Sequence, residues 1–273
     1  MILVIGESLI DMLPSGEGGV RTFRPVVGGS PFNVARALGR LGIPVQYLCP
    51  LSTDAFGGWL REALEESGVD LSLCFRTEAL STLGFVMLDP ATRGASYAFY
   101  TDGTAGCALE RSQLPAALEP GCGCLHIGSF SLAVEPFGST VEHLVSRQAG
   151  DRVVSLDPNL RPFLVRERER FLERYERLLG RVDLVKLSVE DLAWLHPQGS
   201  AAGVARAYLD AGVKLVVITS GGEGAEAHTR LGEARVSAPR VEVVDTVGAG
   251  DTFQAAMLTW LSERGSLHRG ALG

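Results

Sequence analysis

Positive charge is scarce in this sequence, and lysine is almost absent. Lysine and arginine together number 25 against 32 aspartate and glutamate residues, which gives a formal net charge of −7, and Lys186 and Lys214 are the only lysines. No run of basic residues supplies the field that nucleic acid or an anionic membrane surface needs. We therefore expect neither as a partner, and a phosphorylated ligand would need donors arranged locally.

Long apolar runs and a cysteine framework are missing as well. Nowhere do 18 apolar residues follow one another, and the strand-like run 2–5 at the N-terminus has no basic region before it. The five cysteines are odd in number and have neither zinc-like nor thioredoxin-like spacing. The sequence predicts a cytoplasmic protein whose thiols are structural.

What is present is a regular alternation of two patterns along 273 residues. Short β-branched apolar runs alternate with segments of helical periodicity. The strand-like runs are 2–6, 45–48, 124–127, 153–156, 184–187 and 215–219, and the helix-like segments are 31–41, 57–66, 141–148, 165–179, 189–195 and 254–261. This alternation predicts an α/β fold in three layers, with a mostly parallel central sheet and helices on both faces.

Two regions, about 10–25 and 72–102, depart from that alternation. They contain short strand-like pieces of alternating polarity, such as 82–88 and 96–100, with a turn at Asp89-Pro90. Such hairpins are suited to form a small β lid over the carboxyl ends of the main sheet, where open α/β folds bind ligands. We expect one domain, 1–273, that carries this lid.

The clearest chemical pattern is a glycine-rich helix start at 248–251, which reads Gly-Ala-Gly-Asp. Bare backbone N–H groups and the helix dipole favour an anion there. Asp251 would repel a phosphate, but it is placed to accept a proton from an alcohol that attacks one. A simple helix-capping role for Asp251 is equally open on this segment alone.

A second pattern, 28–33, reads Gly-Gly-Ser-Pro-Phe-Asn. Paired glycines before a proline at a helix start allow close approach of a polyol, and Asn33 can both donate and accept hydrogen bonds. Asp11, after the first strand, can bind sugar hydroxyls. An ordinary glycine turn and a solvated loop acid are the alternatives.

Together these segments resemble the ribokinase (PfkB) carbohydrate kinases. Residues 28–35 resemble that family's N-terminal glycine signature, and 245–253 resemble its C-terminal signature, in the expected order and separation. The intermediate segments 157–162, 186–188 and 219–224 match as well, so the resemblance spans residues 1 to about 262. It implies a ribokinase-like fold and ATP-dependent phosphorylation of a sugar hydroxyl, with ATP and Mg²⁺ as cofactors.

The resemblance also implies a role for individual residues at three sites. The catalytic set is Asp251 as general base with Gly248, Ala249 and Gly250 as the anion hole. The substrate set is Asp11, Gly28, Gly29, Asn33, Tyr100 and Arg161. The nucleotide set is Asn159, Lys186, Ser188, Thr219, Gly221 and Gly224. A structural ion pair is the alternative for Lys186 and Arg161, and lid packing is the alternative for Tyr100.

The sequence departs from the family pattern in three places. The magnesium-associated N-x-x-E pattern reads Ser-Val-Glu-Asp at 188–191, so Glu190 and Asp191 are both candidates to organise the metal's water shell. Asp245 and Thr246 are suited to a monovalent cation, but Val247 stands where many members have threonine. Family members usually continue for several dozen residues past the last signature helix, so we expect the C-terminal helices that complete the adenine pocket to lie beyond Gly273.

Fructose is the expected substrate, because 6–11, 28–33 and the aromatic pair at 99–100 look closest to bacterial fructokinases. A 2-keto-3-deoxygluconate kinase and a catalytically weak sugar-binding regulator are the alternatives. A dinucleotide-binding dehydrogenase is disfavoured, because Phe253 stands where that fingerprint needs a small residue. The resemblance further suggests a homodimer formed through the β lid.

Overall fold

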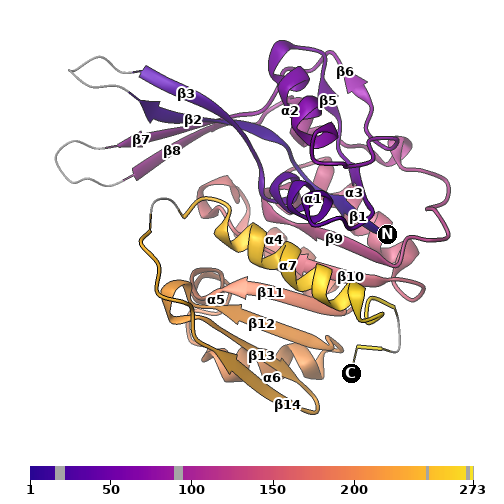
Figure 1. The fold of residues 1–273 in the computed structure, drawn as a ribbon, viewed down its shortest axis with the longest axis vertical. Helices are drawn as coiled ribbons and strands as arrows, with labels where there is room; N and C mark the ends of the chain where they lie inside the picture. The colour runs from indigo at the N-terminus through magenta and orange to yellow at the C-terminus, as the bar shows by residue number, and fades with distance from the viewer. Residues whose placement is uncertain (16–21, 89–94, 244–245, 269–270, 273) are drawn as a thin grey trace.

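The computed structural model describes all residues except 16–21, 89–94, 244–245, 269–270 and 273, and its framework is one large sheet (Figure 1). The strand order is β14-β13-β12-β11-β10-β9-β1-β4. The strands from β12 to β4 in this order are parallel, whereas β13 is antiparallel to β12 and β14 is antiparallel to β13. The strands are β1 (Ile2–Ile5), β4 (Val45–Leu48), β9 (Cys124–Gly128), β10 (Val153–Asp157), β11 (Leu184–Ser188), β12 (Leu215–Thr219), β13 (Ala225–Thr229) and β14 (Gly232–Val236).

Helices cover both faces of this sheet (Figure 1). They are α1 (Ser30–Arg40), α2 (Ala55–Glu65), α3 (Phe137–Gln148), α4 (Arg168–Leu179), α5 (Val189–Leu195), α6 (Ala201–Asp210) and α7 (Ala249–Glu263). The pair α1 and α7 pack together on one face, and α3, α4 and α6 lie on the other. Every residue of β1, β9 and β10 is buried, as expected for parallel strands covered on both sides. The predicted three-layer α/β fold is confirmed.

A second sheet projects from the edge of the molecule as the lid (Figure 1). Its order is β3-β2-β7-β8, built from β2 (Leu9–Ser15), β3 (Thr22–Gly28), β7 (Leu83–Leu88) and β8 (Ala95–Tyr100). The two predicted lid regions therefore pair with each other, although the predicted turn at Asp89-Pro90 lies outside the described residues. Part of the second region, β6 (Arg76–Thr77), instead pairs with β5 (Leu51–Ser52) in a separate two-stranded sheet.

Several boundaries differ from the sequence prediction for visible physical reasons. Helix α3 begins at Phe137, four residues earlier than predicted, and Phe137 and Gly138 are already buried. Helix α4 begins at Arg168, after a short 3-10 turn at Pro162–Leu164. The β13–β14 hairpin was not predicted, since its strands are short and β14 is exposed throughout. None of the described helices is both long enough and apolar enough to span a membrane.

Candidate active site

Asp251 lies in the first turn of α7, and its carboxylate faces the start of α1. Gly248 caps the helix with φ 75°, a left-handed conformation that glycine adopts without strain. The Asp251 side chain is 6% exposed. The predicted base is therefore buried at a helix N-terminus, where the Ala249 N–H also donates to Thr246 O at 3.2 Å.

Three side chains donate hydrogen bonds to this carboxylate. Ser30 Oγ donates to Oδ1 at 2.7 Å, Asn33 Nδ2 donates to Oδ2 at 2.8 Å, and Asn159 Nδ2 donates to Oδ1 at 3.3 Å. Among the described residues, Oδ1 thus accepts two bonds and Oδ2 accepts one. Because a carboxylate oxygen has two acceptor directions, Oδ2 keeps one for a further hydroxyl.

Ser30 is a site residue that the sequence analysis missed. Pro31 sets the start of α1, so Ser30 is its first residue and Asn33 lies one turn later. A spacing of three places both side chains on one face of the helix. That spacing, read together with the assignment of Asn33, is the signal that would have found Ser30.

Burial and hydrogen bonding act in opposite directions on Asp251. Burial raises the pKa of its carboxyl group, whereas the bonds from Ser30 and Asn33 and the charges of Lys186 and Arg161 lower it. The net direction is upward. A raised pKa makes the carboxylate a better proton acceptor, which suits a general base.

Asp11 lies on β2 at the root of the lid, and two glycines make room for it. A Cβ on Gly28 would overlap its carboxylate, and a Cβ on Gly84 would lie 3.1 Å from Oδ1. Burial raises the pKa of Asp11 to about 6, with Arg161 lowering it and Asp251 raising it. Asp11 and Asp251 are therefore close enough to interact electrostatically, while Gly28 contacts Asp11 and Asn33 contacts Asp251.

Gly29, another predicted substrate residue, caps α1 with φ 109°. A Cβ there would lie 2.6 Å from the carbonyl oxygen of Glu7. Because Gly29 has no side chain, the start of α1 can pack directly against the backbone of Glu7, which follows β1.

Within one chain, Tyr100 does not lie on the same face of the lid as Asp11. Asp11 pairs with Gly84, and Gly84 pairs with Phe99, so these three residues share a face of the lid sheet. Successive side chains in a strand point to opposite faces. Tyr100 therefore points away from Asp11, where it is 62% exposed and its ring packs edge-on against Phe85 at 5.7 Å. Phe99 is the lid aromatic beside Asp11.

Lys186 forms a buried ion pair below the helix start. Its Nζ lies 2.9 Å from Asp157 Oδ2, and a Cβ on Gly250 would lie 3.2 Å from the same nitrogen. Burial raises the pKa of Asp157 to about 7, and the Lys186 ammonium opposes this effect. The lysine is therefore held by Asp157 and lies directly beside Gly250, the predicted anion-hole glycine, so the ion-pair and phosphate-site interpretations of Lys186 are compatible.

The structure separates the two candidate metal acids. Glu190 is exposed, whereas Asp191 is buried. Asp191 Oδ1 accepts from Leu160 N at 2.7 Å, and Oδ2 accepts from Ser188 N and Oγ at 3.0 Å. Asp191 thus ties α5 to the loop after β10, whereas Glu190 is exposed, and its role in the water shell of the metal stays a prediction.

The remaining nucleotide residues lie at the end of β12, the strand next to β11. Thr219 ends the strand, and Gly221 follows it in a short 3-10 turn. Gly224 has φ 113°, and a Cβ there would overlap the carbonyl oxygen of Val236, so this glycine is needed for the β13–β14 hairpin. Of the candidate cation residues, Asp245 lies outside the described residues.

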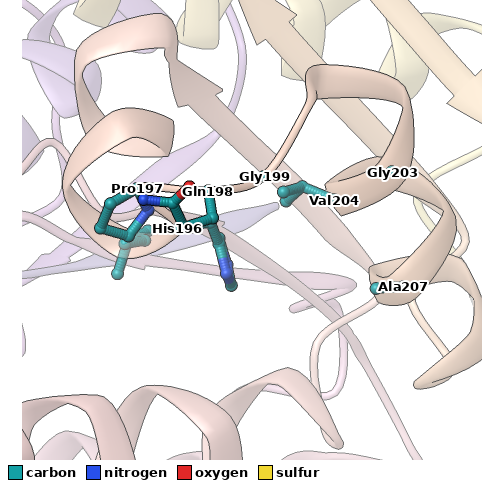
Figure 2. Close-up of a pocket in the computed structure, with 8 residues that line it drawn as sticks. His196, Pro197, Gln198, Gly199, Gly203, Val204 and Ala207 are labelled. Carbon is teal, nitrogen blue, oxygen red and sulfur yellow. The ribbon is translucent and has the colours of Figure 1, made fainter.

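A surface hollow of about 410 Å³ lies elsewhere, between the end of α5 and the start of α6 (Figure 2). It is lined by Leu195, His196, Pro197, Gln198, Gly199, Gly203, Val204 and Ala207. None of the residues around Asp251 lines it. The chemistry described above is therefore not located there.

Comparison with known proteins gives one consistent result. The model of the pfkB family carbohydrate kinases matches residues 1–271. A fructokinase of Rhizobium leguminosarum bv. trifolii is 46% identical over 262 residues, which cover 96% of this chain and 79% of that protein.

Solved structures agree with the sequence comparison. The fructokinase of Xylella fastidiosa with bound ATP superimposes with a TM-score of 0.88 at 32% identity, over 96% of this chain and 81% of that chain. The fructokinase of Vibrio cholerae O395 in its fructose, ADP and calcium ion bound form gives a TM-score of 0.83 at 29% identity, over 96% of this chain and 83% of that chain.

Proposed function

Because the chain belongs to the pfkB family of carbohydrate kinases, we propose that it transfers the terminal phosphoryl group of ATP to a hydroxyl of fructose, giving fructose 6-phosphate and ADP. The observation that carries this proposal is the Asp251 carboxylate. It is buried at a glycine-rich helix N-terminus, and Oδ2 keeps room for one more donor. The fructokinases of Rhizobium, Xylella and Vibrio supply the choice of sugar.

The reaction that this geometry supports is a direct transfer. The sugar hydroxyl donates to Asp251 Oδ2 and loses its proton to that oxygen as its own oxygen attacks the γ-phosphorus. The bond from phosphorus to the bridging oxygen of ADP breaks, and ADP leaves with that electron pair. Backbone N–H groups at the start of α7 and the Lys186 ammonium face the charge on the transferring group. Asp11 and Asn33 orient the sugar.

The residues present fit a magnesium ion that travels with the nucleotide. Asp157 Oδ1 is buried and has no hydrogen-bond partner among the described residues. Asp191 is also buried, and it is close enough for its charge to raise the pKa of Asp157. No cluster of three or more metal-binding side chains occurs in the described part of the chain, which agrees with a metal held mainly by phosphates and water. We assign Asp157 and Asp191 to its water shell. Bound Mg²⁺ neutralises phosphate charge.

The deciding experiment is a coupled ADP-release assay with Mg-ATP over fructose, 2-keto-3-deoxygluconate, ribose and adenosine. We expect the highest kcat/KM with fructose. A preference for the keto-acid would replace the substrate and keep the enzyme class. ADP release with none of the four would contradict the proposal and favour the regulator. Repeating the assay with K⁺ replaced by a tetraalkylammonium salt tests whether the activity depends on a monovalent cation.

A homodimer through the lid is part of the proposal. The outward face of the lid carries Phe23, Phe85 and Tyr100 in edge-to-face contact, at centroid distances of 5.2 and 5.7 Å. An aromatic row on an exposed sheet face is suited to pack against a second copy. Sedimentation of Tyr100→Glu beside the wild type tests this arrangement, with a monomeric variant expected and an unchanged dimer or a monomeric wild type contradicting it. We propose the cytoplasm as the compartment, since it supplies ATP.

A further inference from the structure

Arg161, in the loop after β10, donates hydrogen bonds to its own loop. Its Nη1 donates to three acceptors of its own loop: Asn159 Oδ1 at 2.8 Å, Asn159 O at 3.2 Å and Leu160 O at 3.0 Å. All three acceptors belong to Asn159 and Leu160, the two residues that precede Arg161. The guanidinium therefore fixes the loop, whatever else it contacts when a sugar is bound.

Asn159 has a backbone that needs such support. Its φ of 33° lies in the left-handed region, where asparagine is tolerated better than most residues but is still at a disadvantage to glycine. The turn directs its amide toward α7, where Nδ2 lies 3.3 Å from Asp251 Oδ1. The same amide thus contacts Arg161 through its oxygen and Asp251 through its nitrogen.

The chemistry of the two neighbours leaves one orientation for this amide. Arginine only donates hydrogen bonds, and an ionised carboxylate only accepts them. The amide oxygen must therefore face Arg161, and the NH2 group must face Asp251. If Arg161 is removed, the orientation is no longer determined from both sides, and Asn159 can rotate or leave the strained turn.

We propose that Arg161 is a positioning residue for the catalytic base and acts through Asn159. By holding the amide oxygen, it keeps the Asn159 NH2 group on Asp251 Oδ1, beside the Ser30 hydroxyl on the same oxygen. Two donors then occupy Oδ1, and Oδ2 is the oxygen that receives the proton of the sugar. This role rests on the proposed function, because it concerns the same reaction.

A direct substrate contact makes a different kinetic prediction. The Arg161 charge acts on both Asp11 and Asp251, so its guanidinium is within electrostatic range of the sugar-binding acid and of the base. A residue that binds the sugar equally in ground and transition states raises KM with kcat unchanged, whereas one that aligns the base lowers kcat. The two roles are therefore separable.

The test compares three single variants, Arg161→Gln, Arg161→Lys and Asn159→Gly, with the double variant that combines Arg161→Gln and Asn159→Gly. Asn159→Gly removes the amide and suits a left-handed φ. We expect Arg161→Gln to lower kcat roughly 10- to 100-fold with KM for fructose and ATP within about 3-fold, the scale of a misplaced reacting group. The double variant should match Asn159→Gly within about 2-fold, since both changes break one chain of contacts. Arg161→Lys should restore part of kcat.

The matched control is Arg206→Gln, an arginine on α6 whose side chain is 80% exposed and pairs with Asp210. It should leave kcat unchanged, and all variants should keep the wild-type circular dichroism and melting curve. A raised KM with unchanged kcat for Arg161→Gln, or effects of the two single changes that multiply in the double variant, overturns this role alone. A wild type that phosphorylates no sugar instead contradicts the proposed function and, with it, the role.

Discussion

Asp251, the proposed general base, combines features that a base needs and that a purely structural aspartate does not require. It is buried, and three neutral side chains donate hydrogen bonds to it, while no cation among the described residues lies at ion-pair distance from it. Its charge is therefore stabilised without being neutralised. This leaves the carboxylate free to take a proton when a hydroxyl lies against Oδ2.

Asp251→Asn should abolish this proton transfer while preserving shape. The amide can keep the contacts around Ser30 and Asn33 only in part, so binding of sugar and nucleotide is expected to stay within a few-fold of the wild type. We expect kcat to fall by roughly 10² or more, the scale of general-base loss. Steady-state kinetics with fructose and Mg-ATP measure it, and near-normal turnover would remove Asp251 from the mechanism.

Glu7 is a buried acid next to the site. It is fully buried after β1, Oε2 accepts from Ser131 N at 3.2 Å, and Oε1 has no partner among the described residues. Burial raises the pKa of its carboxyl group to about 7, against the hydrogen bonds from Ser129 and Ser131 that lower it. Glu7 is therefore protonated in the folded protein at mildly acidic pH.

This raised pKa predicts a stability that falls as the pH rises. Between about pH 4.5 and 7 the unfolded chain loses this proton and the folded chain keeps it, so the free energy of unfolding decreases by about 3 kcal/mol across that window. Glu7→Gln removes the titration, and should become more stable relative to the wild type as the pH rises. Urea unfolding at pH 5 and pH 8 measures the difference.

Exposed Glu62 supplies the control for that measurement, since Glu62→Gln makes the same chemical change on the surface of α2. Comparing each variant with the wild type cancels the contributions of Asp11 and Asp157, whose pKa values burial also raises. A stability difference between Glu7→Gln and the wild type that stays constant between pH 5 and pH 8 would show that Glu7 does not carry the raised pKa.

At the scale of elements, the lid meets the main sheet through a cluster of aromatic rings. Phe163, in the turn after Arg161, stacks on Tyr97 at 5.9 Å and lies 5.4 Å from Phe99. Phe99 also contacts Phe130 at 6.0 Å. Strand β8 is thereby packed against the segments that follow β9 and β10, which places Phe99 and Asp11 together over the sheet end.

Gly84→Ala tests this arrangement of the lid. The added Cβ would lie 2.8 Å from the Phe99 ring and 3.1 Å from Asp11 Oδ1, so both side chains must shift. We expect KM for fructose to rise roughly 10-fold, because a displaced Asp11 no longer meets the sugar hydroxyls. Overpacking should also lower the free energy of unfolding by about 1–3 kcal/mol.

Gly58→Ala in α2 is the matched control, since a Cβ there meets nothing within 4 Å. In a helix interior this change is expected to stabilise by up to about 1 kcal/mol and to leave KM unaltered. If Gly84→Ala binds fructose as well as the wild type does, Asp11 is not the sugar ligand or the lid moves freely enough to absorb the methyl group, and the fixed lid described above is wrong.

On the scale of the whole molecule, the site is assembled from segments that are far apart in the sequence. Ser30 reaches Asp251 across 221 residues, and Asn159 reaches it across 92. Ligands that join these segments bind only the folded chain. Their binding free energy therefore adds to the stability of the protein.

Saturating fructose with a non-hydrolysable Mg-ATP analogue should raise the melting temperature. At 100 times Kd a ligand contributes about 2.7 kcal/mol, which corresponds to roughly 5–10 °C for a chain of this size. Asp251→Asn should show the same rise, because binding does not need the proton transfer. A hexose that the assay shows not to be a substrate serves as the control, and an equal rise with that sugar would contradict specific binding.

Much of this molecule follows from the sequence alone. Parallel strands are buried on both faces, so β1, β4, β9, β10, β11 and β12 appear as continuous apolar runs whose ends lie within one residue of the prediction. The glycine-rich start of α7 is likewise a local signal, because a left-handed Gly248 and an acidic first turn depend on neighbouring residues only. Local physics therefore sufficed for the layers, the two lid regions and the glycine-rich helix start, whereas the assignment of Asp251 as the base came from the family resemblance.

The tertiary structure decided what local patterns leave open. Phe99 and Tyr100 are adjacent in sequence, and only the pairing of β8 with β7 determines which ring faces Asp11, since one residue of register exchanges the two faces. Burial likewise separates Asp191 from Glu190. The hydrogen bonds that Ser30 and Asn159 make to Asp251, and that Arg161 makes to Asn159, depend on where the starts of α1 and α7 meet the loop after β10. Contacts between segments so distant in sequence arise only when the chain is folded, because no local periodicity records them.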